Sequence, residues 1–167
     1  MSVFTRPSPI AQPSPTRTGL RTAIATVCLS GMLEDKLAAA ATAGFDGVEI
    51  FEPDLIASPW SPAQVRKHCA DLGLTIDLYQ PFRDFDDARP EVFQANIRRA
   101  DAKFAVMEEL GTDLILVCSS VSPNAVDDDD RIAEQLHTLA SRAGERGLRV
   151  SYEALAWGRF VNTYDRS

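Results

Sequence analysis

Short apolar runs alternate with amphipathic segments along most of the chain. The runs are rich in β-branched and aliphatic residues and predict five strands, at residues 22–29, 46–52, 74–79, 113–118 and 148–158. The segments between them carry apolar residues at helical spacing. Each predicted helix is followed by a glycine that ends it and leads into the next strand: Gly44, Gly73, Gly111 and Gly147. This order predicts a parallel sheet whose strands are joined by crossover helices.

Capping signals support three of the helix starts. Ser61, Pro62 and Gln64 form a capping box with proline at the first helical position, and Pro90 begins the longest helical pattern. The acidic run at residues 127–130 is interpreted as a helix N-terminus, which favours negative charge, rather than as a metal cluster. Pro53 and Asp54 are expected to end the second strand, and a loop with Pro59 and Trp60 to follow it.

Two architectures fit this element order, an open doubly wound sheet and part of an eight-stranded barrel. The first strand–helix turn has the single glycine Gly31 where a dinucleotide fold needs GxGxxG, and the chain has no phosphate-binding P-loop motif. A barrel instead gathers functional side chains at the C-terminal ends of its strands. Such polar residues are Glu49, Glu52, Gln80, Arg83, Ser119, Ser120 and Glu153. The predicted fold class is therefore α/β, a (β/α)8 TIM barrel of which about five strands are present.

Glu153 is the principal candidate site residue. It lies in the fifth predicted strand, which is expected to be a buried parallel strand that carries one carboxylate to its C-terminal end. A buried carboxylate needs a cation, so Glu153 is either paired with an arginine such as Arg83 or Arg159, or is a metal ligand.

The composition and charge of the chain argue against several classes of function. The 167 residues carry a formal charge of −7 and are 45% hydrophobic, which is typical of one globular domain and argues against a nucleic-acid or anionic-membrane surface. No apolar run is long enough for a membrane span. Cys28, Cys69 and Cys118 show no CxxC spacing and are expected to be buried, inert thiols of a cytoplasmic protein.

The first twenty residues differ from the rest. Prolines at positions 7, 9, 13 and 15 lie among Ser, Thr and Arg without apolar periodicity or the apolar core of a signal peptide. Residues 1–20 are expected to form a disordered tail and residues 21–167 the barrel portion.

Several motifs resemble a known family. The segment at 43–51, Ala-Gly-Phe-Asp-Gly-Val-Glu-Ile-Phe, resembles the opening of the xylose-isomerase-like barrels, which include sugar phosphate isomerases, epimerases and endonuclease-IV relatives. Within these, the chain is similar to the bacterial 3-dehydroshikimate dehydratases. The segments that carry this closer resemblance are 24–31, 80–85, 116–123 and 152–159.

The resemblance implies a divalent metal, Mg²⁺ or Mn²⁺, held at the ends of strands five to eight, with Glu153 as its first ligand. It implies a small-molecule substrate, 3-dehydroshikimate, which is dehydrated to protocatechuate after a base removes the proton beside a metal-polarised ketone. Arg83 is expected to bind the substrate carboxylate, unless it braces the loop through Asp84. Gln80 and Tyr79 could orient hydroxyl groups, although Tyr79 suits the barrel core equally, and Ser119 is a further candidate substrate contact.

A barrel of this class takes roughly 250 residues, so the chain is expected to be an incomplete and inactive fragment whose remaining ligands and catalytic groups lie beyond Ser167. His68 and His137 fall within predicted helices and are not expected to be ligands. Two alternatives stay open. One is a sugar phosphate isomerase or epimerase of the same superfamily. The other is a non-catalytic half-barrel that associates with a second copy or another chain through its open strand edge.

Overall fold

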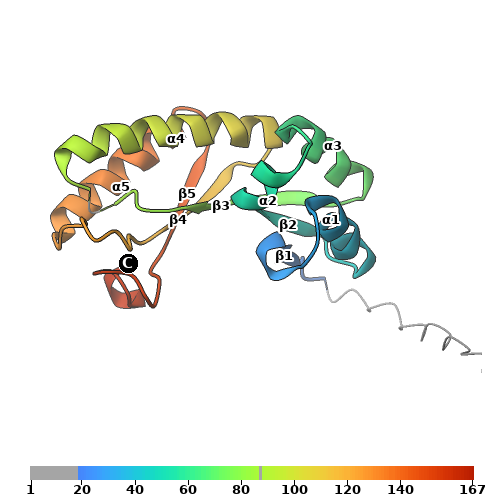
Figure 1. Ribbon diagram of the computed structural model, residues 1–167, viewed down its shortest axis with the longest axis horizontal. Coiled ribbons are helices and arrows are strands. Elements are labelled where there is room, and N and C mark those ends of the chain that lie inside the picture. Colours follow the sequence, from blue (N-terminus) through green and yellow to red (C-terminus); the bar gives the residue numbers. More distant parts are fainter. Residues whose placement is uncertain (1–18, 87) are drawn as a thin grey trace, which may run out of the picture.

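Five parallel strands form a single curved sheet in which each strand pairs with the next along the chain, in the computed structural model. The structure describes residues 19–86 and 88–167, so residues 1–18 of the expected tail lie outside the described part. The strands are β1 (Ala23–Ala25), β2 (Gly47–Phe51), β3 (Thr75–Phe82), β4 (Leu114–Cys118) and β5 (Arg149–Glu153). Figure 1 shows the sheet with α3, α4 and α5 along one side.

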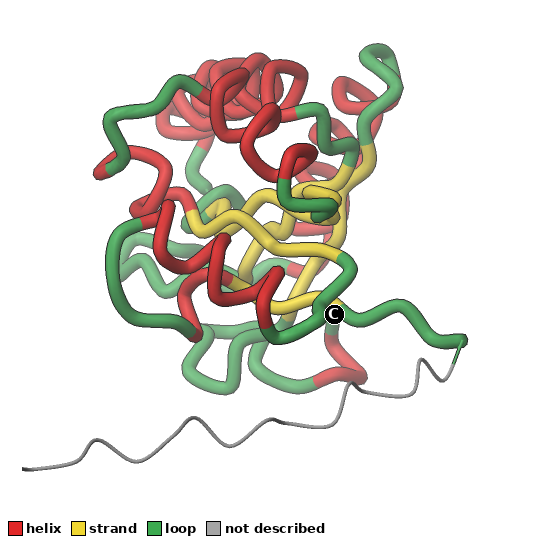
Figure 2. The backbone as a smooth tube through the Cα atoms, turned by 90° about the vertical axis from the view of Figure 1, so that its right-hand side faces the viewer, coloured by secondary structure: helices red, strands yellow, loops and turns green. Residues whose placement is uncertain are grey.

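The helices alternate with the strands. They are α1 (Leu33–Thr42), α2 (Glu52–Ala57), α3 (Pro62–Asp71), α4 (Pro90–Leu110) and α5 (Asp129–Gly144), with single 3₁₀ turns η1 (Thr26–Cys28) and η2 (Tyr164–Arg166). Figure 2 shows the helices packed around the strands. The prediction of a partial TIM barrel with successive β–α units is confirmed for the described residues.

Several predicted boundaries were wrong. The pattern predicts only the end of a strand at Pro53, but helix α2 begins at Glu52, because proline also suits the first turn of a helix. The strand β1 is shorter than predicted, since the chain turns into η1 at Thr26, a buried residue whose hydroxyl accepts a hydrogen bond from the Phe51 N–H. The strand β3 continues through the cis peptide bond between Gln80 and Pro81 to Phe82.

The expected capping signals were correct. Ser61 and Gln64 form a reciprocal capping box at the start of α3, with Pro62 at the first helical position. Asp128, within the acidic run, accepts a hydrogen bond from the Arg131 N–H at the start of α5. Gly111 takes a left-handed conformation at the end of α4, with φ of 73°, which glycine adopts without steric cost.

The core lies between the sheet and the helices. Successive residues of a strand point to opposite faces, and Val48, Ile50, Ile115 and Val117 turn fully buried side chains toward the helix layer. Helix α4 covers them with its own buried residues, among them Phe104, Met107 and Leu110. The opposite, concave face carries no helix of the β–α units (Figure 1), and its residues form the candidate site.

We predict that Ser61→Ala lowers the free energy of unfolding by about 1 kcal/mol, because the N–H of Gln64 loses its capping acceptor. Urea unfolding measures the change. The matched control is Ser141→Ala, an exposed serine inside α5, which should change stability by less than about 0.5 kcal/mol. Equal effects of the two substitutions would contradict a capping role for Ser61.

Candidate functional site at the concave face

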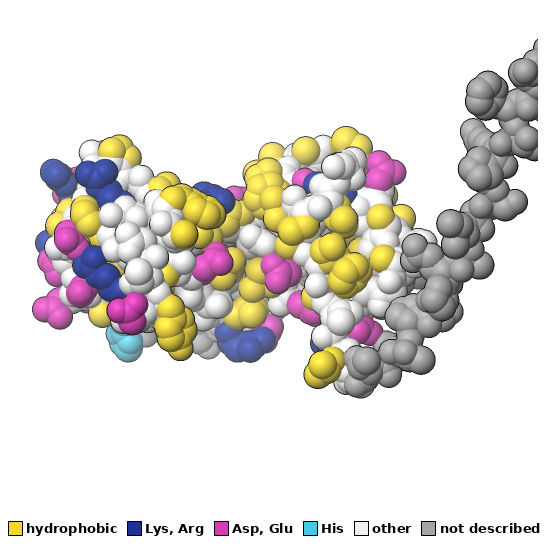
Figure 3. Space-filling model, turned by 90° about the horizontal axis from the view of Figure 1, so that it is seen from below, with side chains coloured by type: hydrophobic (Ala, Val, Ile, Leu, Met, Phe, Trp, Pro, Cys, Tyr) yellow, Lys and Arg dark blue, Asp and Glu magenta, His cyan; other side chains and the backbone are white. Residues whose placement is uncertain are grey.

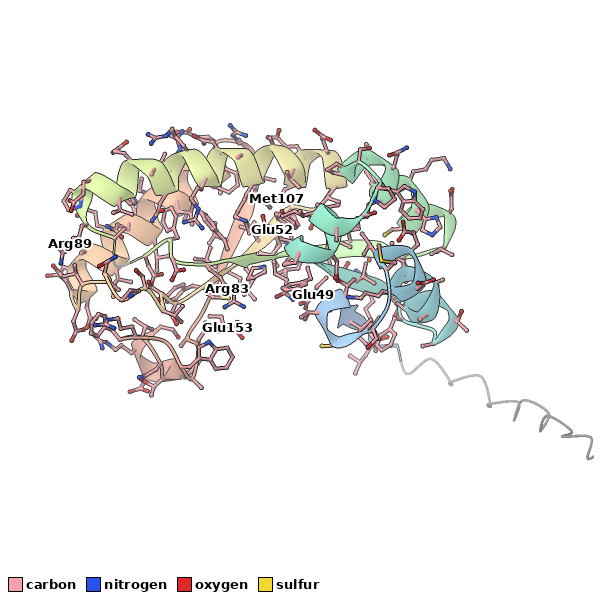
Figure 4. All side chains as sticks on the ribbon, in the orientation of Figure 1. Glu49, Glu52, Arg83, Arg89, Met107 and Glu153 are labelled. Carbon is pink, nitrogen blue, oxygen red and sulfur yellow. The ribbon has the colours of Figure 1, made fainter. Side chains whose placement is uncertain are left out.

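The concave face of the sheet brings together polar side chains from β2, β3 and β5. Glu49, Arg83 and Glu153 all lie on the open side in Figure 4, whereas Glu52 lies on the helix side. Figure 3 shows this face from below, with acidic, basic and apolar side chains close to one another. An open cleft of about 400 Å³ is lined along β5 by Leu116, Ser151, Tyr152, Glu153 and Ala154, with Tyr164 and Ser167.

Glu153 is exposed at the C-terminal end of β5, with Arg149 exposed at the other end and the three residues between them half-buried. The prediction that the fifth strand is buried was therefore wrong for this structure, in which β5 is the edge strand of the sheet. Among the described residues no ion pair joins Glu153 to Arg83 or Arg159. Among those residues the Glu153 carboxylate thus lacks the cationic partner that the bracing interpretation requires.

Cys118 is the β4 residue that contacts Glu153. The two strands are paired so that Cys118 stands directly beside Glu153. The Cys118 thiol donates to Glu153 Oε2 over 3.7 Å. Burial, reinforced by the negative charge of Glu153, raises the pKa of this thiol to about 11, while the positive charge of Arg83 acts in the opposite direction. Glu153 is therefore in contact with the sulfur, and Arg83 is near enough for its charge to act on the thiol. Cys118 was predicted only as a core thiol, and its pairing with Glu153 is a residue contact that sequence reasoning missed.

Arg83 begins the loop between β3 and α4, and its side chain forms no ion pair with a described residue. Asp84, its expected bracing partner, is bound elsewhere: its carboxylate accepts hydrogen bonds from the Val121 N–H at 3.0 Å and the Ser120 hydroxyl at 3.3 Å. The loop backbone is also held by α4, since Arg99 donates to the Arg83 carbonyl and Asn96 to that of Asp84. Arg83 consequently carries a guanidinium without an acidic partner among the described residues, on a loop whose backbone is held by α4.

Gln80 also faces the concave side. Its amide nitrogen donates to Glu49 Oε2 at 2.8 Å, and this hydrogen bond joins β3 to β2. This contact fixes the orientation of the amide, so that its carbonyl oxygen remains available as an acceptor.

Tyr79 points the other way, into the helix layer. It is 3% exposed, and its hydroxyl donates to Glu52 Oε1 at 2.8 Å. Lys103 of α4 also pairs with Glu52 and lies over the Tyr79 ring. Burial and the neighbouring Glu52 carboxylate raise the pKa of Tyr79 well above its usual range. Tyr79 was expected either to orient a substrate hydroxyl group or to lie in the barrel core, and in the structure it lies in the core.

Ser119 is 2% exposed and links two segments of backbone. Its hydroxyl accepts from the Leu155 N–H at 2.9 Å, and its own N–H donates to the Glu153 carbonyl at 2.9 Å. Ser119 therefore holds the end of β5 and the loop after it, instead of lining the cleft. Trp157, in the same loop after β5, is exposed.

Asp86 connects the β3–α4 loop to β5. This 2%-exposed carboxylate accepts a hydrogen bond from the Tyr152 hydroxyl at 2.7 Å. Burial raises the pKa of Asp86, although the hydrogen bond from Tyr152 opposes the shift. Because Tyr152 precedes Glu153, this bond ties the loop that carries Arg83 to the strand that carries Glu153.

The donor set for a metal is partial within the described residues. No group of three or more His, Cys, Asp or Glu side chains gathers there around one point. Both histidines lie in helices, as predicted: His68 of α3 packs against the Trp60 ring, and His137 is exposed on α5. Glu153 is an exposed residue without a cationic partner among the described residues, and its carboxylate could supply one ligand to a divalent cation.

The described residues form a parallel β/α sheet with polar side chains at the C-terminal ends of its strands, which is the face at which TIM barrels bind their ligands. The chain belongs to the xylose isomerase-like TIM barrel family, whose model matches residues 37–167.

Two bacterial proteins named 3-dehydroshikimate dehydratase, from Pseudomonas putida and Pseudomonas aeruginosa, are each 56% identical to this chain over 147 and 148 residues. The alignments cover 88% and 89% of this chain and 23% of each relative, so the chain spans about a quarter of their length. A solved xylose isomerase-like TIM barrel/4-hydroxyphenylpyruvate dioxygenase fusion protein superposes with a TM-score of 0.86 at 56% identity, over 88% of this chain and 24% of that one.

The fold is also that of an IolI protein solved with a zinc atom, at a TM-score of 0.73 and 14% identity over 88% of this chain and 56% of that one.

In the described residues, no helix is both long and apolar enough to cross a membrane. Contrary to expectation, Cys28 is exposed, because it lies on the turn η1 after the short strand β1, whereas Cys69 and Cys118 are buried as expected.

We predict that Asp86→Asn makes stability less dependent on pH. In the unfolded chain Asp86 ionises near its ordinary pKa of about 3.9, whereas burial keeps its folded-state pKa higher. Its contribution to stability is therefore fully present below the unfolded pKa and is lost as pH rises through the folded pKa.

The difference in free energy of unfolding, Asn variant minus wild type, should consequently increase between pH 4 and pH 7.5 in urea titrations. Asp165→Asn, at an exposed residue, is the matched control and should show no such trend. A constant difference for Asp86→Asn across this range would show that Asp86 does not titrate differently on folding.

Proposed function

We propose that the chain supplies five strands and part of the site of a divalent-metal-dependent 3-dehydroshikimate dehydratase, a lyase that forms protocatechuate and water. The observation that carries the proposal is the high identity to two Pseudomonas proteins of that name, spread over nearly the whole described chain. The concave face supports it, since a substrate with a carboxylate, a ketone and hydroxyl groups needs a cation, a Lewis acid and hydrogen-bonding groups.

Arg83 is assigned to the substrate carboxylate. A guanidinium matches a carboxylate with two parallel N–H···O bonds, and Arg83 has no acidic partner among the described residues that would compete. The hydrogen bonds that hold the Arg83 and Asp84 carbonyls keep the base of the side chain in place. Less conformational entropy is then lost when the substrate binds.

Gln80 is assigned to a substrate hydroxyl group. Its amide is oriented by Glu49, and the free carbonyl oxygen of Gln80 can accept a hydrogen bond from the ligand. We assign Tyr79 and Ser119 structural roles instead, the former in the core and the latter in holding the end of β5.

Glu153 is assigned as a metal ligand, with Mg²⁺ or Mn²⁺ as the expected ions. When bound, the metal would polarise the substrate ketone and so acidify the neighbouring C–H. Glu153 supplies a charged oxygen at the mouth of the barrel, and the Ser119 N–H bond to its carbonyl fixes the backbone from which it projects.

The other two candidate functions have less support. Solved sugar epimerases, such as a D-psicose 3-epimerase at 19% identity and a TM-score of 0.68, share the fold alone. A non-catalytic half-barrel would leave the edge of β5 open for a second copy, and sizing chromatography over a range of concentrations distinguishes this possibility from a monomer.

We predict that the 167-residue chain by itself forms no protocatechuate from 3-dehydroshikimate with added Mg²⁺ or Mn²⁺. Glu153 supplies one ligand position, and a metal site that supports catalysis needs about three. Product is followed by ultraviolet absorption and chromatography. Metal-dependent turnover by this chain would contradict the proposal that other strands complete the site.

A chimera tests Glu153. Residues 20–167 replace the matched segment of the Pseudomonas putida relative, so that the rest of the barrel comes from that protein. Glu153→Gln in the chimera should lower metal-dependent turnover by about 100-fold or more and weaken Mn²⁺ binding, because a neutral amide oxygen binds the ion less well than a carboxylate.

The change in stability should be small, since no described cation depends on Glu153. The matched control is Glu145→Gln at the exposed end of α5, which should leave activity and binding unchanged. Intact metal binding together with a large loss of stability, about 3–5 kcal/mol, would identify Glu153 as a structural brace.

Arg83→Gln in the same chimera should lower kcat/KM about 10- to 100-fold, the effect of losing a charge-assisted hydrogen bond worth about 1.5–3 kcal/mol. The KM for 3-dehydroshikimate should rise while Mn²⁺ affinity stays the same. Arg98→Gln, at an exposed residue of α4, is the control. An unchanged KM in Arg83→Gln would rule out the carboxylate contact.

A further inference from the structure

Asp86 and Tyr152 form a hydrogen bond between the two segments that carry the charged groups of the site. Asp86 lies in the β3–α4 loop, three residues after Arg83, and Tyr152 directly precedes Glu153 in β5. The Tyr152 hydroxyl donates to Asp86 Oδ2 at 2.7 Å, and Asp86 is 2% exposed. One short bond thus joins the segment of the proposed carboxylate-binding group to the strand of the proposed metal ligand.

The loop that contains Asp86 is also held by other elements. The Asp84 carboxylate accepts a hydrogen bond from the Val121 N–H in the β4–α5 loop. The buried Gln135 side chain of α5 bonds to both backbone groups of Ala88, accepting from its N–H at 3.0 Å and donating to its carbonyl at 2.6 Å. These bonds fix the loop relative to its neighbours, and the Asp86 bond connects the fixed loop to β5.

The end of β5 depends on such an anchor because β5 is an edge strand of the sheet. Side chains alternate along a strand, so Tyr152 and Glu153 point to opposite faces. The Tyr152 ring packs against the core, and its bonded hydroxyl restricts rotation of the strand end about its own axis. The direction in which Glu153 projects from the concave face is thereby fixed from the other side of the sheet.

The buried carboxyl group of Asp86 lowers stability. Burial disfavours its charged form, and its second oxygen, Oδ1, is buried without a hydrogen-bond partner among the described residues. An apolar residue of similar size would avoid both penalties. A costly polar group between two site residues is better explained by the geometry that it imposes than by a gain in stability.

We propose that Asp86 and Tyr152 are positioning residues, which set the place of Glu153 relative to Arg83 so that one substrate molecule can reach both. The inference rests on the proposed function and adds to it two residues that act without touching the substrate. A substrate held by its carboxylate at Arg83 must present its ketone on the Glu153 side, and a misplacement of about 1 Å can lower turnover about 100-fold. Loss of the Asp86–Tyr152 bond should therefore act mainly on kcat, whereas loss of Arg83 raises KM.

The first test uses the 167-residue chain and measures amide hydrogen exchange by NMR. The N–H groups of Ser119 and Leu155 each make a hydrogen bond that holds the end of β5. In Tyr152→Phe both should exchange at least about 10-fold faster, because the anchor on the other face is lost. The Val65 N–H, bonded at the start of α3, is the control and should be unchanged. Unchanged exchange at Ser119 and Leu155 would overturn the inference.

The second test measures kcat in the chimera, expressed for the folded fraction determined by urea unfolding. Tyr152→Phe and Asp86→Leu should each lower kcat about 10- to 100-fold and change KM less than about 3-fold. Asp86→Asn should retain most of the activity, because its amide oxygen still accepts from the Tyr152 hydroxyl. The double variant of Asp86→Leu and Tyr152→Phe should be no slower than either single variant, since both remove the same bond.

Tyr79→Phe is the matched control, because it removes another buried hydroxyl–carboxylate bond, within the helix layer. It should lower stability and leave kcat unchanged. Normal kcat in the folded fraction of Tyr152→Phe would overturn the inference, as would equal losses in Asp86→Asn and Asp86→Leu or additive losses in the double variant. An unsubstituted chimera without dehydratase activity would contradict the proposed function instead, and the exchange rates at Ser119 and Leu155 would still test the anchor.

Discussion

Burial of one face of the parallel sheet against α4 is the constraint from which the site follows. Ile115 and Val117 of β4 are fully buried under the helix layer with Phe104 and Met107 of α4. Because side chains alternate along a strand, packing these residues inward forces Cys118 to the concave face. The hydrogen-bonded register then places Glu153 beside it. The location of Glu153 and Cys118 on the concave face is thus a result of hydrophobic packing on the other side of the sheet.

Charge is distributed differently on the two faces. On the helix side, buried cations are paired, as Lys36 is with Asp54 at 2.8 Å and Lys103 with Glu52. Pairing there offsets part of the large cost of removing charge from water. On the concave face, Arg83 and Glu153 lack such partners among the described residues and lie near the same thiol. Unpaired charge that is held in place is a property of binding sites, since it is free to act on a ligand.

The β3–α4 loop joins the two charges. Asp84, with φ of 53°, adopts a left-handed conformation that is uncommon for a residue other than glycine. Its carboxylate binds the loop after β4, and Asp86 binds Tyr152 of β5. The sequence analysis considered Asp84 only as a possible partner of Arg83 and did not single out Asp86. Their contacts are long-range, and no local pattern encodes them.

The sequence by itself determined the five strands, the four longer helices between them and the family, because apolar periodicity, glycine stops and the Ser61 capping box are local properties of the chain. It also indicated Glu153, Arg83 and Gln80 as strand-end groups. Only the tertiary structure decided which face each side chain occupies. It turned Tyr79 into the core, buried Ser119 as a backbone link and placed Cys118 against Glu153. The physical reason is that strand register and the bend at the end of β3 depend on packing between residues far apart in the chain, and shifting by one residue exchanges the two faces.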